Sequence, residues 1–515
     1  MTDRQGQTLP EVQLPAGRLR GSVEGGVVAF KGVPYAAPPV GDLRWRAAQP
    51  HPGWSGTREA TAYGPSCPQL YMEGGDPVLG GHGFPPFDDD CLTLNVWTPA
   101  LDDARRPVLV WIHGGGFVSG SGSLPIYSGD TFARDGDLVV VTLNYRLGPL
   151  GYLSFGDEGS ADAQPANLWL TDQLAALRWV RDNIAHFGGD PDTITVAGQS
   201  GGAMSTAALA GHPEAQKLFR RAILQSPPLG LHIPTRDEYQ ERVDAYLESA
   251  GVKSVDELRQ VPWPRLNEAV VGLFAHTVRW GHWPTPFLPV RDDVTVFRHP
   301  AETLLHGAAT DIEVLIGWTR EEANFNFALD PAYANATRAQ VVDRIAERFG
   351  GGAAAFVYDE YARTRPGARP VDVLMDLVSD ELFRVPCVEL AEARAAAGRP
   401  VWAFQFDFPA PAYGGRVAAA HCLELPFVFD NFASWSHAPL VEGIDPVVGG
   451  GLAESMHQAW IAFARTGDPN HAGMPTWPRY TTEDRTTMRF DAITLPVSDL
   501  AGHARRLHGG RLSAC

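Results

Sequence analysis

Residues Thr193-Ile-Thr-Val-Ala-Gly-Gln-Ser-Gly-Gly202 place a serine between a strand and a helix. The first five are β-branched or small and predict a buried strand, and the small residues after Ser200 predict a helix. A serine on so sharp a turn needs a strained backbone, which leaves room only for glycine at positions 198 and 202. The helix dipole would favour a developing negative charge beside Ser200. This context predicts a nucleophilic serine; the alternative is a Gly-rich turn whose serine caps the helix.

Other strand-like runs on both sides of this segment alternate with helical patterns. Each is almost continuously apolar, which is typical of a parallel sheet that is covered by helices on both faces. Besides the strand before Gly198, the predicted strands are residues 108–112, 138–143, 314–316 and 401–406. One helix is predicted over residues 171–187 with Gly188 as its C-terminal cap, and another over residues 340–349. The sequence therefore predicts an α/β fold.

A second glycine-rich segment, His113-Gly-Gly-Gly-Phe117, follows the strand at 108–112. Three consecutive glycines leave the backbone free to turn the N–H groups of Gly115 and Gly116 toward one point. Together with the N–H of Gly201, they could bind the oxyanion of an acyl-transfer intermediate. A flexible loop or a phosphate cradle is the alternative, but the chain contains neither G-x-G-x-x-G nor G-x-x-x-x-G-K-[ST].

A serine nucleophile of this kind is followed along the chain by an Asp or Glu and then by a His. His421 fits this order because it follows the strand at 401–406, within Ala418-Ala-Ala-His-Cys-Leu-Glu-Leu-Pro-Phe427. The other late histidines lie in loops without a preceding strand or in a helix; they are His437, His457 and His471. The acid should end a strand before His421. Glu321 and Glu322 both follow the strand at 314–316, and the pattern alone does not choose between them.

Composition and charge exclude several classes of protein. The 515 residues are 44% hydrophobic, as in a well-cored globular protein, and the net charge of −18 disfavours nucleic acid as a partner. No apolar run approaches the roughly 20 residues that cross a bilayer. Residues 1–11 are polar and lack the apolar core of a signal peptide. We therefore expect a cytoplasmic location, no membrane partner, and neither a metal nor a cofactor; the sequence gives no indication of oligomeric state.

The whole chain resembles the type-B carboxylesterases, a family that includes bacterial para-nitrobenzyl esterases and the cholinesterases. The resemblance extends from about Gly21 to about Tyr480. Besides G-x-S-x-G it rests on Phe30-Lys-Gly-Val-Pro-Tyr-Ala-Ala-Pro-Pro-Val-Gly-Asp-Leu-Arg44, Asp90-Cys-Leu-Thr-Leu-Asn-Val-Trp97, Asp172-Gln-Leu-Ala-Ala-Leu-Arg-Trp-Val180, Phe187-Gly-Gly-Asp-Pro191 and Ala464-Arg-Thr-Gly-Asp-Pro-Asn470. It implies an α/β-hydrolase fold, with a mostly parallel central sheet, helices on both faces and a small N-terminal antiparallel extension.

The resemblance also implies one catalytic domain over residues 1–515, in which residues 230–310 and 325–395 are insertions that line a pocket. The Arg- and Gly-rich residues 503–515 are expected to fray. In the family the acid is the fifth residue after a glycine, in a pattern like G-t-n-r-[DE]-E, and counting from Gly317 gives Glu322. His421 matches the His of A-x-H-x-x-E-L-P-F. The implied triad is Ser200, Glu322 and His421.

The chain departs from the family at several positions. The usual G-E-S-A-G is G-Q-S-G-G here, so Gln199 removes an acid beside the nucleophile and Gly201 replaces an alanine. Cys67 and Cys91 match a pair that forms a disulfide in secreted members, a bond that is not expected in a cytoplasmic protein. The loop between them has no tryptophan, so the aromatic platform on which cholinesterases bind a quaternary ammonium is missing.

These features predict a serine esterase that forms an acyl-enzyme and releases it with water. Its pocket should be apolar and should accept small to medium uncharged esters. The candidate wall residues are Phe117, Gln199, Leu229, Leu231, Phe287 and Leu288, with Trp280 and Trp283 nearby in sequence. The alternatives are an amidase, a carbamate hydrolase or a bulky-ester hydrolase with the same triad, because the shape of the pocket selects the leaving group. A binding module without catalysis is less expected, because such relatives lack the nucleophile.

Overall fold

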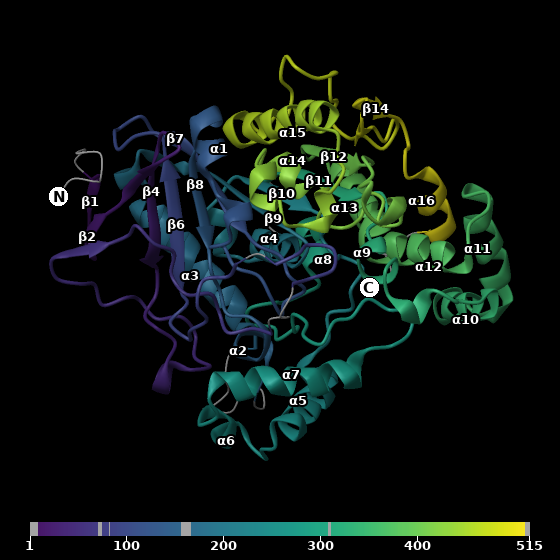
Figure 1. The fold of residues 1–515 in the computed structure, drawn as a ribbon, viewed down its shortest axis with the longest axis horizontal. Coiled ribbons are helices and arrows are strands. Elements are labelled where there is room, and N and C mark those ends of the chain that lie inside the picture. The colour runs from purple at the N-terminus through teal and green to yellow at the C-terminus, as the bar shows by residue number, and fades with distance from the viewer. Residues whose placement is uncertain (1–8, 71–74, 82, 156–165, 307–310, 510–515) are drawn as a thin grey trace.

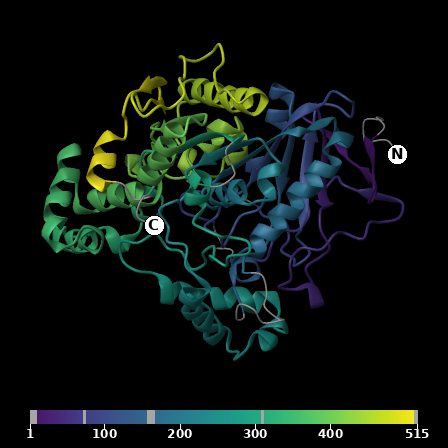
Figure 2. The ribbon, with the colours of Figure 1, turned by 180° about the vertical axis from the view of Figure 1, so that it is seen from behind.

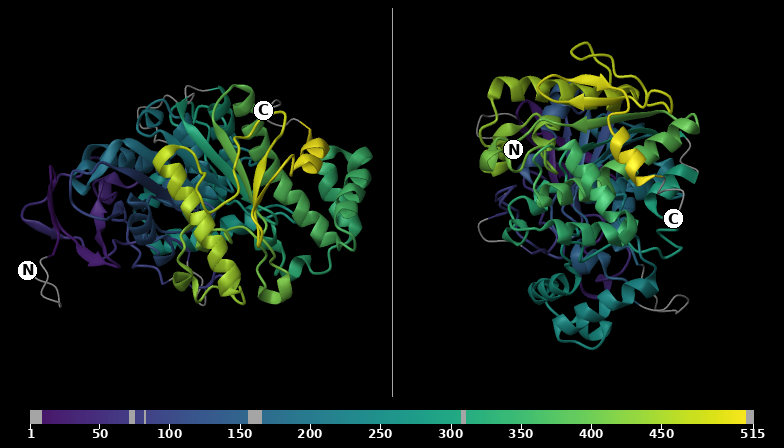
Figure 3. Two further views of the ribbon diagram at one scale, coloured as in Figure 1. Left: turned by 90° about the horizontal axis from the view of Figure 1, so that it is seen from above. Right: turned by 90° about the vertical axis from the view of Figure 1, so that its right-hand side faces the viewer.

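A twisted sheet runs through the whole molecule, and helices cover both of its faces (Figures 1, 2 and 3). The structure is a computed structural model that describes residues 9–70, 75–81, 83–155, 166–306 and 311–509. The sheet has eleven strands in the order β14-β13-β12-β11-β10-β9-β7-β8-β6-β4-β3. Their bounds are β3 (Ser22–Glu24), β4 (Val27–Pro34), β6 (Thr93–Thr98), β7 (Arg106–Ile112), β8 (Val139–Leu143), β9 (Gly189–Gln199), β10 (Arg221–Gln225), β11 (Glu313–Thr319), β12 (Val401–Phe406), β13 (Thr487–Phe490) and β14 (Leu495–Val497).

The centre of the sheet is parallel and its edges are antiparallel. All neighbours from β13 through β8 pair in parallel. Strands β3, β4 and β6 pair antiparallel at one edge, and β14 does so at the other. A separate three-stranded sheet near the N-terminus contains β1 (Glu11–Leu14), β2 (Gly17–Arg20) and β5 (Thr57–Glu59). In this small sheet β1 and β2 pair antiparallel, whereas β2 and β5 pair in parallel. The structure confirms the predicted α/β-hydrolase architecture with a small N-terminal extension, whose antiparallel part is the β1–β2 pair.

Side chains from both faces of the central strands are buried. In β7, Val108, Val110 and Ile112 enter one hydrophobic core, whereas Leu109 and Trp111 enter the core on the other face. The first core includes side chains of α3, α4 and α13, and the second includes side chains of α1 and α15. Because neither face meets water, the strands read as continuous apolar runs.

The helices fall into an N-terminal and a C-terminal set. The first contains α1 (Asp130–Gly136), α2 (Gly148–Tyr152), α3 (Leu168–Asn183), α4 (Gly201–Gly211), α5 (Arg236–Ala250), α6 (Val255–Arg259), α7 (Trp263–Thr277) and α8 (Pro300–His306). The second contains α9 (Asn324–Phe327), α10 (Arg338–Phe349), α11 (Gly351–Thr364), α12 (Pro370–Ser379), α13 (Val385–Ala396), α14 (Leu425–Val428), α15 (Pro446–Thr466) and α16 (Gly502–His508). Among the described residues, no helix has the length and apolarity that a membrane span requires.

Both predicted helices are present. The first begins earlier than expected, at Leu168, and its last turn is a 3₁₀ helix over Ile184–Phe187. Gly188 follows with a φ of 80°, the left-handed cap that the sequence predicts. The second predicted helix is α10, which starts with a capping box between Thr337 and Gln340.

Two groups of helices extend from the sheet. Helices α5, α6 and α7 lie together at the lower edge of Figure 1. Helices α10, α11 and α12 lie at its right-hand side and share a small core of their own, which includes Val341, Tyr361 and Leu374.

The expectation of a frayed C-terminal tail from residue 503 is wrong for residues 503–508. These residues form most of α16, in which Ala504 and His508 are buried. Nε2 of His508 lies 2.6 Å from the hydroxyl of Tyr361. The Arg- and Gly-rich composition gave no sign of this buried face, because the face exists only where α16 meets other helices, among them α11 and α13. Residues 510–515 lie outside the described part of the chain.

Four of the five cysteines are described, and all four are buried free thiols. Cys67 and Cys91 are close neighbours, since a hydrogen bond with Cys67, followed by burial, raises the pKa of the Cys91 thiol. The backbone N–H of Leu147 also donates to the Cys67 sulfur at 3.2 Å. The pair that forms a disulfide in secreted relatives is therefore present here as two adjacent thiols.

Candidate active site

Ser200 occupies the sharp turn between β9 and α4. Its backbone is strained, with φ at 57° and ψ at −125°, as the sequence predicts for this turn. A Cβ added to Gly198 would lie 2.5 Å from the carbonyl carbon of Gly202, and one added to Gly202 would lie 2.1 Å from the Ile112 oxygen. Only glycine fits at either position, so the turn can present Ser200 at the end of the parallel strands.

Glu322 and His421 form a buried pair beyond the ends of two neighbouring strands, β11 and β12. Oε2 of Glu322 lies 2.5 Å from Nδ1 of His421, and the two side chains are 0% and 3% exposed. The backbone N–H of Thr319 donates to the other oxygen of Glu322 at 2.7 Å. A carboxylate on Nδ1 fixes the imidazole tautomer and leaves Nε2 to accept a proton.

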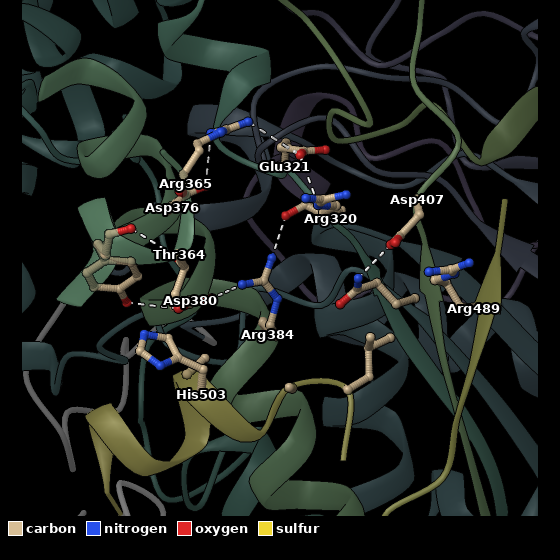
Figure 4. A pocket seen from close by; sticks show the side chains of 15 residues that line it. Arg320, Glu321, Thr364, Arg365, Asp376, Asp380, Arg384, Asp407, Arg489 and His503 are labelled. Atoms are coloured by element: carbon tan, nitrogen blue, oxygen red, sulfur yellow. Dashed lines mark hydrogen bonds and ion pairs between the residues drawn. The ribbon is translucent and has the colours of Figure 1, made fainter. Parts of the chain in front are cut away.

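The adjacent carboxylate, Glu321, contacts different groups. One of its oxygens pairs with Arg320 and Arg365 in a cavity of about 360 Å³ (Figure 4). The other accepts a hydrogen bond from the backbone of Ala419. The sequence pattern did not choose between Glu321 and Glu322. In the structure Glu322 contacts His421, whereas the carboxylate of Glu321 contacts Arg320, Arg365 and Ala419.

Gln199 lies against the same histidine. Its amide nitrogen is 3.1 Å from Nε2 of His421, and the residue is 1% exposed. Among the described residues, the Gln199 amide is the hydrogen-bond partner of Nε2 of His421. No hydrogen bond between described residues joins this Nε2 to the hydroxyl of Ser200, although Ser200 directly follows Gln199 in the chain. Such a bond between nucleophile and base commonly tightens only when substrate binds. Gln199 therefore contacts the base itself, a closer position than the pocket wall that the sequence predicts for it.

The segment His113–Phe117 packs on the turn that bears Ser200. A Cβ added to Gly114 would lie 3.1 Å from the Cβ of Ser200, and one added to Gly115 would lie 2.0 Å from the Ser119 oxygen. Gly115 and Gly116 have φ values of 121° and 60°, which other residues rarely adopt. Gly114 therefore lies directly against Ser200, and the two glycines that follow it have backbone conformations that favour glycine.

Three aromatic rings surround His421. The ring centroids of Phe383, Trp283 and Phe325 lie 5.1, 5.4 and 6.0 Å from that of the imidazole. Trp283 lies near the predicted wall residues in sequence but was not itself predicted at the site, and Phe325 and Phe383 were missed. Phe325 follows Glu322 by three residues and could have been suspected, whereas the sequence around Phe383 carries no signal of its position.

The other predicted wall residues are mostly buried. Phe117, Leu229, Phe287 and Leu288 are 6% exposed or less and belong to one hydrophobic core. Phe117 packs on Tyr152, and Phe287 packs on Tyr246 of α5. Leu231 is half-buried and lines a cavity of about 650 Å³ together with Trp283.

A second buried acid, Glu424, was also missed. It is 0% exposed, and its Oε1 accepts a hydrogen bond from Gln225 at 3.2 Å. Gln225 is itself held by Trp460, and its backbone oxygen accepts from the N–H of Ser200. Burial, and then the charge of Glu322, raise the pKa of Glu424 to about 7. The sequence pattern A-x-H-x-x-E could have indicated Glu424, because its acid stands three residues after the histidine.

Glu424→Gln should flatten the dependence of stability on pH. The folded pKa of about 7 lies above the ordinary value of 4.5, so between these values the folded protein binds more protons than the unfolded chain. The free energy of unfolding therefore falls as pH rises through this window, by up to about 3 kcal/mol from this group. Urea unfolding of both proteins at pH 5 and pH 8 measures the difference. If the free energy of unfolding falls equally between pH 5 and pH 8 in the wild type and in Glu424→Gln, the raised pKa does not belong to Glu424.

A strained serine at the end of a parallel sheet, with a buried carboxylate–imidazole pair beside it, defines a serine hydrolase of the α/β-hydrolase class. The model of the carboxylesterase family matches residues 8–501. Phenmedipham hydrolase of Pseudarthrobacter oxydans is 52% identical over 478 residues, which are 93% of this chain and 94% of that protein. Para-nitrobenzyl esterase of Bacillus subtilis (strain 168) is 37% identical and covers 92% of this chain and 94% of its own.

Solved structures agree with these matches. The carboxylesterase EST55 of Geobacillus stearothermophilus superposes with a TM-score of 0.86 at 39% identity, covering 97% of this chain and 100% of its own. The chain belongs to the carboxylesterase family, as its resemblance to the type-B members predicts, and it is an enzyme that hydrolyses carboxylic esters.

Proposed function

We propose that Ser200, His421 and Glu322 hydrolyse the ester in two acyl-transfer steps. Nε2 of His421 takes the hydroxyl proton as Ser200 Oγ attacks the carbonyl carbon, and then gives that proton to the departing alcohol. Glu322 holds Nδ1 and stabilises the imidazolium. Water attacks the resulting acyl-enzyme in the same way and releases the acid and free Ser200. The buried 2.5 Å contact between Glu322 and His421 is the observation that carries this proposal.

The backbone N–H groups of Gly115, Gly116 and Gly201 are the proposed oxyanion hole. The close packing of Gly114 on Ser200 and the positive φ values of Gly115 and Gly116 support this role. Gly201 begins α4, so its N–H is one of those that no residue within the helix can bind. Each donor of this kind contributes about 3 kcal/mol to lowering the barrier.

Small to medium uncharged esters are the proposed substrates. The three aromatic rings around His421 support an apolar site. We propose that residues 230–310 and 325–395 are insertions that line the approach to it, since they contribute Trp283, Phe325 and Phe383. Phe117, Leu229, Leu231, Phe287 and Leu288 stay as proposed wall residues.

Aryl carbamates are a second candidate class of substrate. The relative named phenmedipham hydrolase is 52% identical over nearly the whole chain, which favours this class specifically. The same nucleophile can attack a carbamate carbonyl and expel the alcohol, which leaves a carbamoyl group on Ser200. Water then releases a carbamic acid, which loses CO₂ and leaves the free amine.

A substrate panel separates these classes. We expect rapid release of p-nitrophenol from p-nitrophenyl butyrate, and a kcat/KM for butyrylthiocholine that is lower by about 100-fold, because Gln199 is neutral and offers no charge to a cation. Methyl N-phenylcarbamate, assayed by release of aniline, tests the second candidate. A preference for butyrylthiocholine would overturn the proposed substrate class while leaving the triad untouched.

We further propose that the enzyme acts in the cytoplasm, without a nucleic-acid or membrane partner. The adjacent free thiols of Cys67 and Cys91 support a reducing compartment. The net charge of −18 supports the exclusion of nucleic acid.

A further inference from the structure

Glu321 binds the segment that carries His421 at two points. Its backbone N–H donates to the oxygen of Ala419 at 3.0 Å, and its Oε2 accepts from the N–H of Ala419 at 3.2 Å. Ala419 precedes His421 by two residues, and Glu321 directly precedes Glu322. These two hydrogen bonds therefore join the turn that bears the acid to the segment that bears the base.

The segment around His421 needs such support, because its backbone is strained. Ala418 and Cys422 have φ values of 54° and 75°, which non-glycine residues adopt at a cost of about 1 kcal/mol or more each. Strain of this kind persists only where the surroundings hold the backbone in place. The backbone oxygen of Ala418 accepts a hydrogen bond from the N–H of Ala410 at 3.0 Å, and Glu321 holds the next residue, Ala419.

A network of charges holds the Glu321 carboxylate. Its Oε1 lies 3.1 Å from Nε of Arg320 and 3.5 Å from Nη2 of Arg365, whose Nη1 lies 3.2 Å from Asp376. Figure 4 shows these side chains converging in the cavity that Glu321 faces. Burial raises the pKa of Glu321, and the two arginines oppose this rise. One oxygen of the carboxylate is thus anchored by cations, and the other is left for Ala419.

We propose that Glu321 is a positioning residue, which sets the distance between Glu322 and His421 by binding the backbone of Ala419. This role rests on the proposed triad. A displacement of about 1 Å between reacting groups lowers an enzymatic rate by about 100-fold. The effect should fall on kcat, because the hydrogen bonds and ion pairs of Glu321 among the described residues do not reach the proposed oxyanion hole or the proposed wall residues.

The test compares three substitutions of Glu321 with a matched control. Glu321→Ala removes the acceptor, and Glu321→Asp keeps the charge but draws the oxygen back by one methylene. Glu321→Gln keeps an oxygen in reach of Ala419. Asp407→Asn changes another carboxylate that lines the same cavity but accepts a hydrogen bond from Gln405 instead.

With p-nitrophenyl butyrate, we expect Glu321→Ala to lower kcat by about 100-fold with KM within about threefold, and Glu321→Asp to lower it by about tenfold. Glu321→Gln and Asp407→Asn should stay within about fivefold. The low-field proton NMR signal of His421 Nδ1–H should shift or broaden in the Ala and Asp variants and persist in the other two. If Glu321→Ala does not fold, the comparison of kcat and of the NMR signal is made between Glu321→Asp and Glu321→Gln.

The proposal is overturned if Glu321→Ala and Glu321→Asp keep wild-type kcat and the NMR signal, or if Glu321→Gln loses as much as Glu321→Asp. Equal losses in Asp407→Asn would also overturn it, since they would indicate a general effect of the cavity. Glu322→Gln, measured in parallel, distinguishes a failure of the proposed triad from a failure of the positioning role of Glu321. If that variant stays fully active, the triad itself fails; if it is inactive while all Glu321 variants are normal, only the positioning role fails.

Discussion

Ser200→Ala is expected to lower kcat/KM for p-nitrophenyl butyrate by about 10⁴- to 10⁶-fold. The substitution removes the hydroxyl that the strained turn between β9 and α4 carries, and without it the proposed acyl-enzyme cannot form. The proposed oxyanion donors are backbone groups and remain, so a small residual rate above that of water is expected. Stopped-flow or plate-reader release of p-nitrophenol measures the loss.

Ser205→Ala is the matched control for this experiment. Ser205 lies in the same helix, α4, is fully buried and accepts a hydrogen bond from Gln173 at 3.1 Å, but it is not part of the proposed triad. Both variants should keep the far-UV circular dichroism of the wild type, and Ser205→Ala should stay within about threefold in activity, because substitutions away from the reacting groups act mainly on stability. Retention of more than about one per cent activity by Ser200→Ala would contradict its role as nucleophile.

Glu322→Gln is expected to lower kcat by about 10³- to 10⁴-fold with little change in KM. A neutral amide cannot stabilise the imidazolium that forms as Ser200 loses its proton. It also offers N–H groups where the Thr319 N–H and His421 Nδ1 now meet oxygens at 2.7 and 2.5 Å, so the imidazole would turn or change its tautomer. Glu322 and His421 are 0% and 3% exposed, so bulk solvent does not reach the pair to replace the lost interactions.

Glu321, the residue before Glu322, provides a matched control for this prediction. Glu321→Gln is the same chemical change one position earlier, and it should keep activity within about fivefold because its oxygen still reaches Ala419. The opposite ranking, with Glu321→Gln inactive and Glu322→Gln active, would assign the acid to Glu321 and contradict the structure.

The fold could be predicted from local pattern to a large extent. The strands of the sheet centre are apolar on both faces, and the glycine spacing around Ser200 reflects a turn in which Gly198 and Gly202 touch. These features depend on residues close together in the chain. Residues 503–508 were predicted wrongly because their burial depends on helices that are distant in sequence, among them α11 and α13.

The candidate site was predictable only in part, for the same reason. The order of Ser200 and His421 along the chain indicated a triad, but the choice of Glu322 over Glu321 required the family resemblance. The direction of each carboxylate is set by partners on other segments, namely His421 for one and Ala419 and Arg365 for the other. Phe383 could not be predicted, because an aromatic residue in a helical region is as common in a core as beside a base.

Labelling with a fluorophosphonate, followed by mass spectrometry of the digested protein, tests the proposed nucleophile most directly. The reagent reacts preferentially with a serine whose hydroxyl is activated by a neighbouring base. A single adduct on the peptide that contains Ser200, absent from Ser200→Ala, is the predicted result. An adduct on a different residue, or undiminished labelling of Ser200→Ala, would contradict the proposed catalytic site.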